Sequence, residues 1–375
     1  MTASLVIRKD NFEEHYDILE EIGSGQFATV KKCVEKSSNS EFAAKIMKKK
    51  RRSSRRGVTA EQLCQEANIL LKARHPGVIY LHEVFENNAE FTLVLELLSG
   101  GELFEFLVEQ EFLTENEAIG FTKQVVDAVD YLHDCHIVHL DIKPENIVLK
   151  DRIQKKVKLI DFGLARIIVP GDIVKAIMGT PEFVAPEVIS YEPVGTATDM
   201  WAVGVLTYIL LSGASPFLAD DDIETFANIQ NVSYEFDQEY FADITSQAKE
   251  FISSLLKKKT SDRLSARDCK KHPWLHEPEP EVSLKRRSTL IKTETFRAFT
   301  ARARWKNSLK KVIAMNRLAV LAGKKDGGVL SADLLQQSDC SDTSDSDSEM
   351  PDQTNLKTAK TRTNSQLLQD RSYKH

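Results

Sequence analysis

Two short segments near the middle of the chain carry the feature that most constrains its fold and chemistry. The first runs His139-Leu-Asp-Ile-Lys-Pro-Glu-Asn146, and Asp161-Phe-Gly163 begins 15 residues after Asn146. Asp141 can act as the carboxylate beside an attacking hydroxyl, and Lys143 can neutralise charge on a transferred phosphate. Asp161 and Asn146 offer the hard oxygen ligands that Mg²⁺ prefers. This ordered set predicts phosphoryl transfer.

A glycine-rich turn between two expected strands is a second candidate for phosphate binding. Glycine lets the backbone approach phosphate oxygens closely, and a hairpin of this kind can close over a nucleotide. A plain turn is the alternative, and Ala28 stands where the motif usually has its third glycine. The expected nucleotide-binding residues of this turn are Ile22, Gly23, Ser24, Gly25, Gln26, Phe27, Ala28, Thr29 and Val30.

Lys45 lies inside the otherwise apolar run Ala-Ala-Lys-Ile at 43–46. An unpaired ammonium would be costly there, so we expect a carboxylate partner. Glu66, on the helix expected at 59–73, is suitable, and the pair would let Lys45 hold the α- and β-phosphates of ATP. An exposed edge-strand lysine is the alternative, but the apolar neighbours on both sides argue against it.

Taken together, these segments resemble the motif set of the protein kinases. Ala-Pro-Glu at 185–187 is a further landmark, and the segments at 141–146 and 179–182 are similar to those of serine/threonine kinases. The resemblance implies that ATP and Mg²⁺ are the cofactors. It further implies that Glu187 pairs with Arg263, that Leu95 guards the nucleotide pocket, and that the backbones of Glu96 and Leu98 bind adenine.

The distribution of secondary-structure signals predicts an α+β, two-lobed protein kinase fold. Short β-rich runs occupy residues 12–98, and the pattern becomes helical after 101. Thr114 and Glu117 form a capping box, and 199–211 is apolar almost all round, which predicts a buried helix. We expect a small antiparallel-β lobe with one main helix, a larger helical lobe and a C-terminal regulatory helix.

The predicted boundaries follow the composition along the chain. Residues 16–275 are expected to be the catalytic domain, and 276–325 the autoregulatory and calmodulin-binding segment, of which 276–295 reads as a linker. Residues 326–375 are expected to be a disordered tail with an acidic serine cluster at 338–349.

Leu140 stands where many kinases have an arginine that binds a phosphorylated activation loop. The loop at 164–184 contains no Ser or Tyr, and its single Thr is Thr180. The absence of the phosphate-binding arginine is consistent with the absence of a Ser or Tyr phosphorylation site in the loop. We therefore predict that activity does not need phosphorylation of this loop.

Residues 296–325 contain nine Lys or Arg and no Asp or Glu. Trp305, Leu309 and Val312 share one helical face, whereas Leu318 is rotated away by roughly 140°. Anchors on two sides suit a partner that wraps around the helix. With Arg304 they predict binding of calcium-loaded calmodulin; a solvated or membrane-surface helix is the alternative. Ser308 is a candidate regulatory phosphosite because a phosphate would alter this basic interface.

The loop at 48–56 holds seven basic residues in nine. Such a run can be a solvated loop or a nuclear-localisation patch. Together with 96–104, 179–187 and 210–218, however, it resembles the death-associated protein kinases. The resemblance implies contacts of this loop with calmodulin or with a second copy in a homodimer. It also implies substrates such as myosin regulatory light chain, and roles in apoptosis, autophagy or actomyosin control.

Residues 139–141 and 178–180 are also similar to a related branch of apoptosis-inducing kinases that is independent of calmodulin. A pseudokinase scaffold and a small-molecule kinase are further alternatives. Glu102 and Glu145 should flank the cleft, and the triplet at 220–222 adds acidity, which predicts basic protein substrates.

The chain shows no candidate membrane span or signal peptide, and its five cysteines lack metal or disulfide spacing. We expect a cytoplasmic protein, with a cytoskeletal association as an option, and no nucleic-acid partner.

Overall fold

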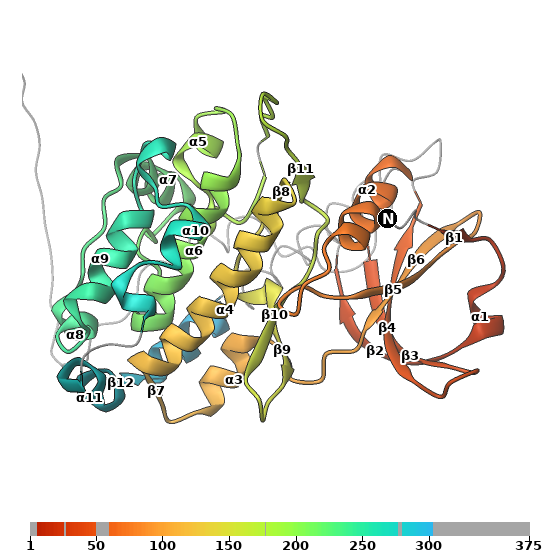
Figure 1. Ribbon diagram of the computed structural model, residues 1–375, viewed down its shortest axis with the longest axis horizontal. Coiled ribbons are helices and arrows are strands. Elements are labelled where there is room, and N and C mark those ends of the chain that lie inside the picture. The colour runs from red at the N-terminus through yellow and green to blue at the C-terminus, as the bar shows by residue number, and fades with distance from the viewer. Residues whose placement is uncertain (1–5, 26–27, 50–59, 177, 277–279, 303–375) are drawn as a thin grey trace, which may run out of the picture. The chain divides into compact units, whose positions relative to one another are not determined.

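The computed structural model describes residues 6–25, 28–49, 60–176, 178–276 and 280–302. The first part of the chain forms a six-stranded sheet in the order β1-β5-β6-β4-β3-β2, with helix α2 beside it (Figure 1). Its elements are β1 (Ile7–Arg8), α1 (Phe12–His15), β2 (Tyr16–Ser24), β3 (Ala28–Glu35), β4 (Glu41–Lys48), α2 (Ala60–Lys72), β5 (Leu81–Glu86) and β6 (Glu90–Glu96). Apart from the parallel pair β1–β5, neighbouring strands are antiparallel. The predicted small β lobe is confirmed.

Alternation along β4 explains how the sheet positions Lys45. Side chains two residues apart on a strand share a face. Ala44 packs in a small cluster on one face, whereas Ala43 and Met47 join the main core together with Leu63 of α2. Lys45 has the same parity as Ala43 and Met47, so its side chain points to the face that α2 covers.

The second part of the chain is mostly helical, as predicted. Its elements are α3 (Leu103–Glu109), β7 (Phe112–Thr114), α4 (Glu115–Asp134), β8 (Ile137–Val138), η1 (Pro144–Asn146), β9 (Ile147–Asp151), β10 (Lys156–Leu159), β11 (Arg166–Ile167), η2 (Pro181–Phe183), α5 (Pro186–Ile189), α6 (Thr196–Ser212), α7 (Asp222–Asn231), α8 (Gln238–Phe241), α9 (Ser246–Leu255), η3 (Thr260–Asp262), α10 (Ala266–Cys269) and η4 (Pro273–Leu275). Both halves of the predicted capping box of Thr114 and Glu117 are present at the start of α4. Every residue of α6 from Thr198 to Ser212 is buried, which confirms the predicted buried helix.

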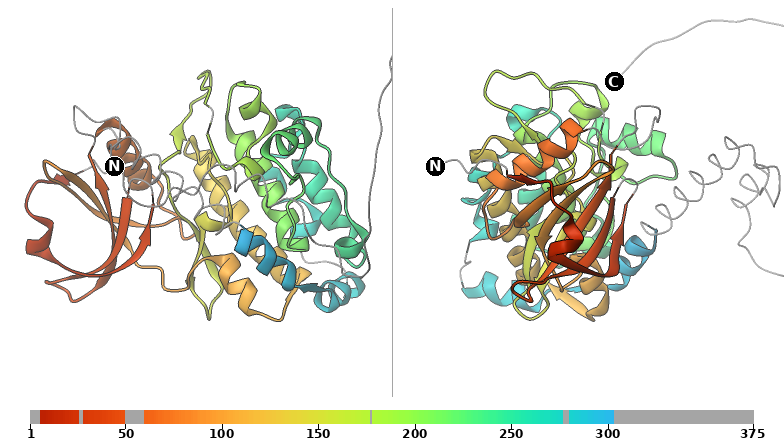
Figure 2. Two further views of the ribbon diagram at one scale, coloured as in Figure 1. Left: turned by 180° about the vertical axis from the view of Figure 1, so that it is seen from behind. Right: turned by 90° about the vertical axis from the view of Figure 1, so that its right-hand side faces the viewer.

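The chain continues to pack on the large lobe after η4, so the interpretation of 276–295 as a linker is wrong. Helix α11 (Pro280–Ser288) is followed by β12 (Leu290–Lys292), which pairs antiparallel with β7. Residues 294–302 are helical and lie beside α3 (Figure 2). Phe296 is fully buried and Phe299 is 6% exposed, both against Phe104. We call residues 280–299 the clamp.

Among the described residues, no helix is both long and apolar enough to cross a membrane.

Candidate active site

Lys45 pairs with two carboxylates, one from each lobe. Its ammonium lies 2.8 Å from Glu66 Oε1 on α2 and 2.8 Å from Asp161 Oδ1 in the large lobe. The predicted Lys45–Glu66 pair is therefore present. The Glu66 side chain is 7% exposed, whereas that of Asp161 is 48% exposed. One carboxylate thus fixes the lysine from the interior, and the other is accessible to a ligand.

The electrostatics of this group favour the charged forms. Burial alone would lower the pKa of Lys45, but the carboxylates of Glu66 and Asp161 outweigh it and raise that pKa above its ordinary value. Burial likewise opposes ionisation of Asp161, and the nearby ammonium of Lys45 overcomes it, so the pKa of Asp161 is lowered. At neutral pH Lys45 is therefore positively charged, and Asp161 beside it is ionised.

Asp141 sits at the centre of the second group of predicted residues. Lys143 Nζ donates to Asp141 Oδ2 at 2.8 Å, and Asn146 Nδ2 donates to the same oxygen at 2.9 Å and to the Asp141 carbonyl at 2.8 Å. The turn η1, with Pro144 preset for its first helical position, brings Asn146 back over Asp141. Lys143 also reaches Thr180 Oγ1 at 3.3 Å.

The backbone around these groups is held in an uncommon conformation. Leu140 has φ 62° and Asp161 has φ 59°, which is costly for residues other than glycine. The Asp199 carboxylate on α6 accepts from the N–H groups of His139 and Leu140, each at 2.8 Å. The ring of Phe162 packs against His139 at 4.8 Å between centroids. The Asp199 carboxylate therefore fixes the segment at 139–140 to α6, and the ring contact packs this segment against the one that contains Asp161 and Phe162.

Asp199 is a site residue that the sequence reasoning missed. Its neighbours in 199–211 are apolar, so the hydrophobic pattern predicts only a buried helix. A fully buried acid at the start of such a helix could have signalled this role, since buried charges require strong donors. His133 Nε2, 2.9 Å from Asp199 Oδ2, completes its partners.

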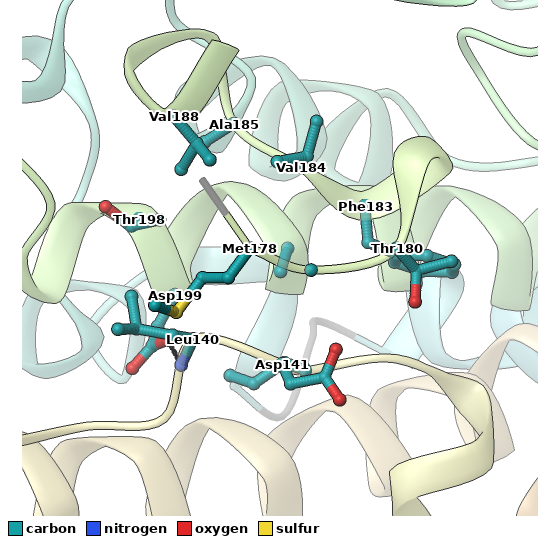
Figure 3. Close-up of a pocket in the computed structure, with 13 residues that line it drawn as sticks. Leu140, Asp141, Met178, Thr180, Phe183, Val184, Ala185, Val188, Thr198 and Asp199 are labelled. Carbon is teal, nitrogen blue, oxygen red and sulfur yellow. Dashed lines mark hydrogen bonds between the residues drawn. The ribbon is translucent and has the colours of Figure 1, made fainter. Parts of the chain in front are cut away.

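A small cavity separates the catalytic segment from the chain around Gly179 (Figure 3). Leu140 and Met178 point into it, together with Val188 of α5, so its lining is largely apolar. Leu140 is 8% exposed. Apolar side chains of the loop and of the catalytic segment thus face each other across this cavity, at the position where many kinases have an arginine that binds a phosphorylated loop. This geometry agrees with the prediction that no loop phosphate is needed.

The predicted brace between Glu187 and Arg263 is present. The guanidinium forms two bonds of 2.7 Å with the carboxylate, and the side chains are 2% and 0% exposed. Thr198 Oγ1 donates to the same carboxylate at 2.9 Å. Bidentate geometry and burial make this pair rigid, which anchors the loop that lies over the cavity.

The other expected nucleotide-binding residues lie in the β2–β3 turn, at the end of β6 and in the large lobe. Gly25 N–H donates to the Ala28 carbonyl at 2.8 Å and closes the β2–β3 turn, whereas Gln26 and Phe27 lie outside the described residues. Leu95 is buried. The Glu96 N–H is already bonded to the Tyr80 carbonyl at 3.0 Å. Glu102 precedes α3 and Glu145 belongs to η1. Adenine binding by the Glu96 and Leu98 backbones stays a prediction.

Comparisons with known proteins agree with this geometry. Residues 16–275 match the protein kinase domain family. Over 321 residues the chain is 50% identical to death-associated protein kinase 2 from Mus musculus and from Homo sapiens, covering 85% of this chain and 87% of each relative. The chain belongs to the death-associated protein kinase family. It is therefore a serine/threonine protein kinase.

A solved structure is similar to this death-associated protein kinase over most of the chain. It is the twitchin kinase fragment from C. elegans, described as an autoregulated protein kinase with immunoglobulin domains, with a TM-score of 0.74 and 37% identity. The match covers 80% of this chain and 66% of that one. The likeness supports the two-lobed kinase fold.

The predicted regulatory residues of this death-associated protein kinase lie outside the described residues. They are Arg304, Trp305, Ser308, Leu309, Val312 and Leu318, and the basic loop 48–56 is described only for its first two residues.

Proposed function

We propose that this kinase transfers the γ-phosphate of ATP to Ser or Thr in basic proteins such as myosin regulatory light chain, under control of calcium-loaded calmodulin. The observation that carries the catalytic part is that Lys143 and Asn146 both donate to Asp141 Oδ2, at 2.8 and 2.9 Å. The proposed roles are in apoptosis, autophagy or actomyosin control, in the cytoplasm and at the cytoskeleton.

We assign each of these side chains a distinct role in the phosphoryl transfer. Asp141 orients the substrate hydroxyl and accepts its proton, and the two donors on its Oδ2 hold the carboxylate in place. Lys143 offsets negative charge on the phosphate, and its contact with Thr180 links this charge to the loop beside the substrate. Lys45 binds the α- and β-phosphates while Glu66 keeps it in place.

The oxygen donors fit a magnesium ion. Asp161 has a half-exposed ionised carboxylate, and Asn146 uses its amide nitrogen on Asp141, so its amide oxygen is the atom with metal-binding chemistry. Mg²⁺, when bound, would neutralise charge on the phosphate oxygens. Asp161 and Asn146 are the residues we expect to hold it.

Control through the C-terminal segment is supported by three features. The sequence 296–325 is basic and carries apolar anchors on two sides. The clamp is packed on the large lobe, and Arg302, three residues after it, lies 3.5 Å from Glu182, two residues beyond Thr180. A similar solved kinase is described as autoregulated. We infer that residues after the clamp block the substrate cleft until calmodulin binds them.

The test compares the full chain with Trp305→Ala and with a chain ending after residue 302. A basic Ser peptide and ATP are supplied with and without calcium-loaded calmodulin. We expect calmodulin to activate the full chain, to act weakly on Trp305→Ala, and to have no effect on the shortened chain, which should be active throughout. Ending at 302 keeps Phe296 and Phe299 in the core, whereas an earlier end would remove them.

Two results would contradict the proposal. Equal activity of the full chain with and without calmodulin would favour the calmodulin-independent branch. Equal turnover by Asp161→Asn and the unmodified chain would remove the catalytic assignment.

A further inference from the structure

A lysine of the large lobe is buried at the boundary with the small lobe. The side chain of Lys158 on β10 is 8% exposed, and its ammonium lies 2.5 Å from Glu96 Oε1 at the end of β6. The same ammonium donates to the Val78 carbonyl at 3.0 Å. A buried ammonium requires strong acceptors, and both of these acceptors come from the part of the chain that precedes the large lobe.

The segment at 77–80 connects β10 and the end of β6 through its backbone. It exchanges two backbone hydrogen bonds with Leu159 of β10, of 2.8 and 3.0 Å. Tyr80 then bonds to Glu96 twice: its N–H donates to Glu96 Oε1 at 2.8 Å, and its carbonyl accepts from the Glu96 N–H at 3.0 Å. The end of β6 is therefore fixed to β10 by this strip of backbone, and the Lys158 ammonium bridges the two directly.

This connection lies between the two ends of the expected nucleotide site. Glu96, whose backbone we expect to bind adenine, is at one end. The strand β10 leads to the other end, because Asp161 comes three residues after Lys158 and lies 2.8 Å from the Lys45 ammonium. In Figure 1, β10 lies where the sheet of the small lobe meets the large lobe. Lys158 thus ties the adenine end to the metal end without being among the groups expected to contact the nucleotide.

Stability alone does not explain a buried ion pair at this place. Replacing such a pair with well-packed apolar residues is often neutral or stabilising, so its advantage should lie in how it fixes two segments relative to each other. We propose that Lys158 is a positioning residue for the nucleotide, which fixes the backbone at Glu96 relative to Asp161 and thereby slows the release of ADP. This inference rests on the proposed use of ATP.

Release of ADP requires the adenine end and the metal end of the site to separate. Movement of the end of β6 away from β10 would break the contact between the Lys158 ammonium and the Glu96 carboxylate. A buried donor that loses an acceptor is destabilised, so the ion pair opposes this movement. The Glu96 side chain is 20% exposed, so water can take the place of the lysine once the strands part, which makes the movement reversible.

The experiment measures release of a fluorescent N-methylanthraniloyl derivative of ADP from the full chain, with Mg²⁺ present, on mixing with excess unlabelled ADP. We expect Lys158→Met to speed release by about threefold to tenfold, because the tie is lost. With calcium-loaded calmodulin present, KM for ATP should rise by a similar factor, whereas KM for a basic serine peptide should stay the same. Lys156→Met, at an exposed position of the same strand, is the matched control and should release the label like the unmodified chain.

Glu96→Gln tests the same tie with little change in shape. It removes the charge and keeps an oxygen for the Tyr80 N–H, so it should also speed release. Adding Lys158→Met to it should then have less effect than Lys158→Met has alone. If Lys158→Met does not fold, the release rate of Glu96→Gln decides.

A purely structural role of the ion pair predicts another result. Fewer molecules would fold, so the apparent kcat would fall while the release rate stayed the same. Release from both Lys158→Met and Glu96→Gln at the rate of the unmodified chain would therefore overturn the inference. An undiminished effect of Lys158→Met in the Glu96→Gln chain would also overturn it, because Lys158 would then not act through Glu96.

Failure of the proposed function is distinguishable from failure of this inference. An unmodified chain that neither binds the labelled ADP nor phosphorylates the peptide would refute the use of ATP, and the inference with it. Phosphorylation by the unmodified chain, together with unchanged release from the variants, would refute only the inference.

Discussion

Two cations in this kinase, one largely and one fully buried, are surrounded in opposite ways. Lys45 in the cleft has two carboxylate partners, one of which, Asp161, is 48% exposed. Arg286 in the clamp is 1% exposed and has its donors on the His276 carbonyl at 3.1 Å and on Gln247 Oε1 at 2.6 Å. Its carboxylate neighbour Glu115 is fully buried and 4.0 Å away.

The difference separates a group built to bind a ligand from a group built to stay closed. The Lys45 group includes a half-exposed carboxylate that can bind an incoming metal ion and an ammonium that can bind an incoming phosphate, so its partners can change. Glu115, in contrast, accepts from Trp274 Nε1 at 3.0 Å and from the Thr245 N–H at 3.0 Å, which leaves a sealed network. Burial with fixed partners gives rigidity, and access to solvent allows exchange.

The largest effect should follow from Asp161→Asn. The variant keeps the shape of the side chain but loses the charge that offers a metal ligand. We expect kcat to fall by about 10³-fold or more, since charge stabilisation of this kind is worth several kcal/mol. Stability should change by less than about 1 kcal/mol, because Glu66 still pairs with Lys45. Steady-state kinetics and thermal unfolding measure the two. A large loss of stability would place Asp161 in the same class as Arg286.

Arg286→Met should have the opposite profile. Removing one member of a buried charged network leaves Glu115 without a compensating cation, which costs about 3 kcal/mol or more. Denaturant titration should show this loss, while the KM for ATP of the folded enzyme stays the same. Arg287→Met, at the exposed neighbouring position of α11, is the matched control and should be nearly neutral. A neutral Arg286→Met would mean that the clamp does not depend on this network.

Gly213→Ala tests the contact between the clamp and the end of α6. Gly213 has φ 71°, and an added Cβ would lie 1.9 Å from Thr295 Oγ1. We expect a loss of about 1–3 kcal/mol from the strained backbone and the clash. Gly120→Ala, in α4 with nothing within 4 Å of the added Cβ, should instead be neutral or stabilising. Unfolding midpoints that move equally for both variants would rule out the clash as the cause.

Local patterns were sufficient to predict the fold and to identify residues that the structure brings together in the candidate site. The apolar neighbours of Lys45 implied a carboxylate partner, and the structure confirms Glu66. The clamp was missed because α11 is polar and its main anchor is an arginine, which hydrophobic periodicity treats as exposed. The contact of Arg302 with Glu182 joins two distant segments and depends on where the clamp ends, so no local pattern could predict it.

The smallest effect is expected at a partly exposed ion pair in the first turn of α4. Glu117 lies 2.7 Å from Lys155, and its carboxylate also accepts from the Thr114 N–H at 3.0 Å. Burial opposes ionisation, but the bonds from Lys155 and Thr114 prevail, so the pKa of Glu117 is lowered. A lowered pKa means that the charged form stabilises the fold above the unfolded value of about 4.3, and that this gain is lost as pH falls through the folded pKa.

Glu117→Gln removes the charge and keeps an oxygen for the cap. Because both side chains of the pair are more than a third exposed, solvent screening limits the cost to about 0.5 kcal/mol at pH 7. The difference in unfolding free energy between the variant and the unmodified chain should shrink as pH falls below about 4.3. Other carboxylates titrate in both chains and cancel in this difference. A gap that is the same at pH 7 and at pH 4 or below would show that packing, and not charge, holds this end of α4, and would place Glu117 with the sealed groups of the clamp.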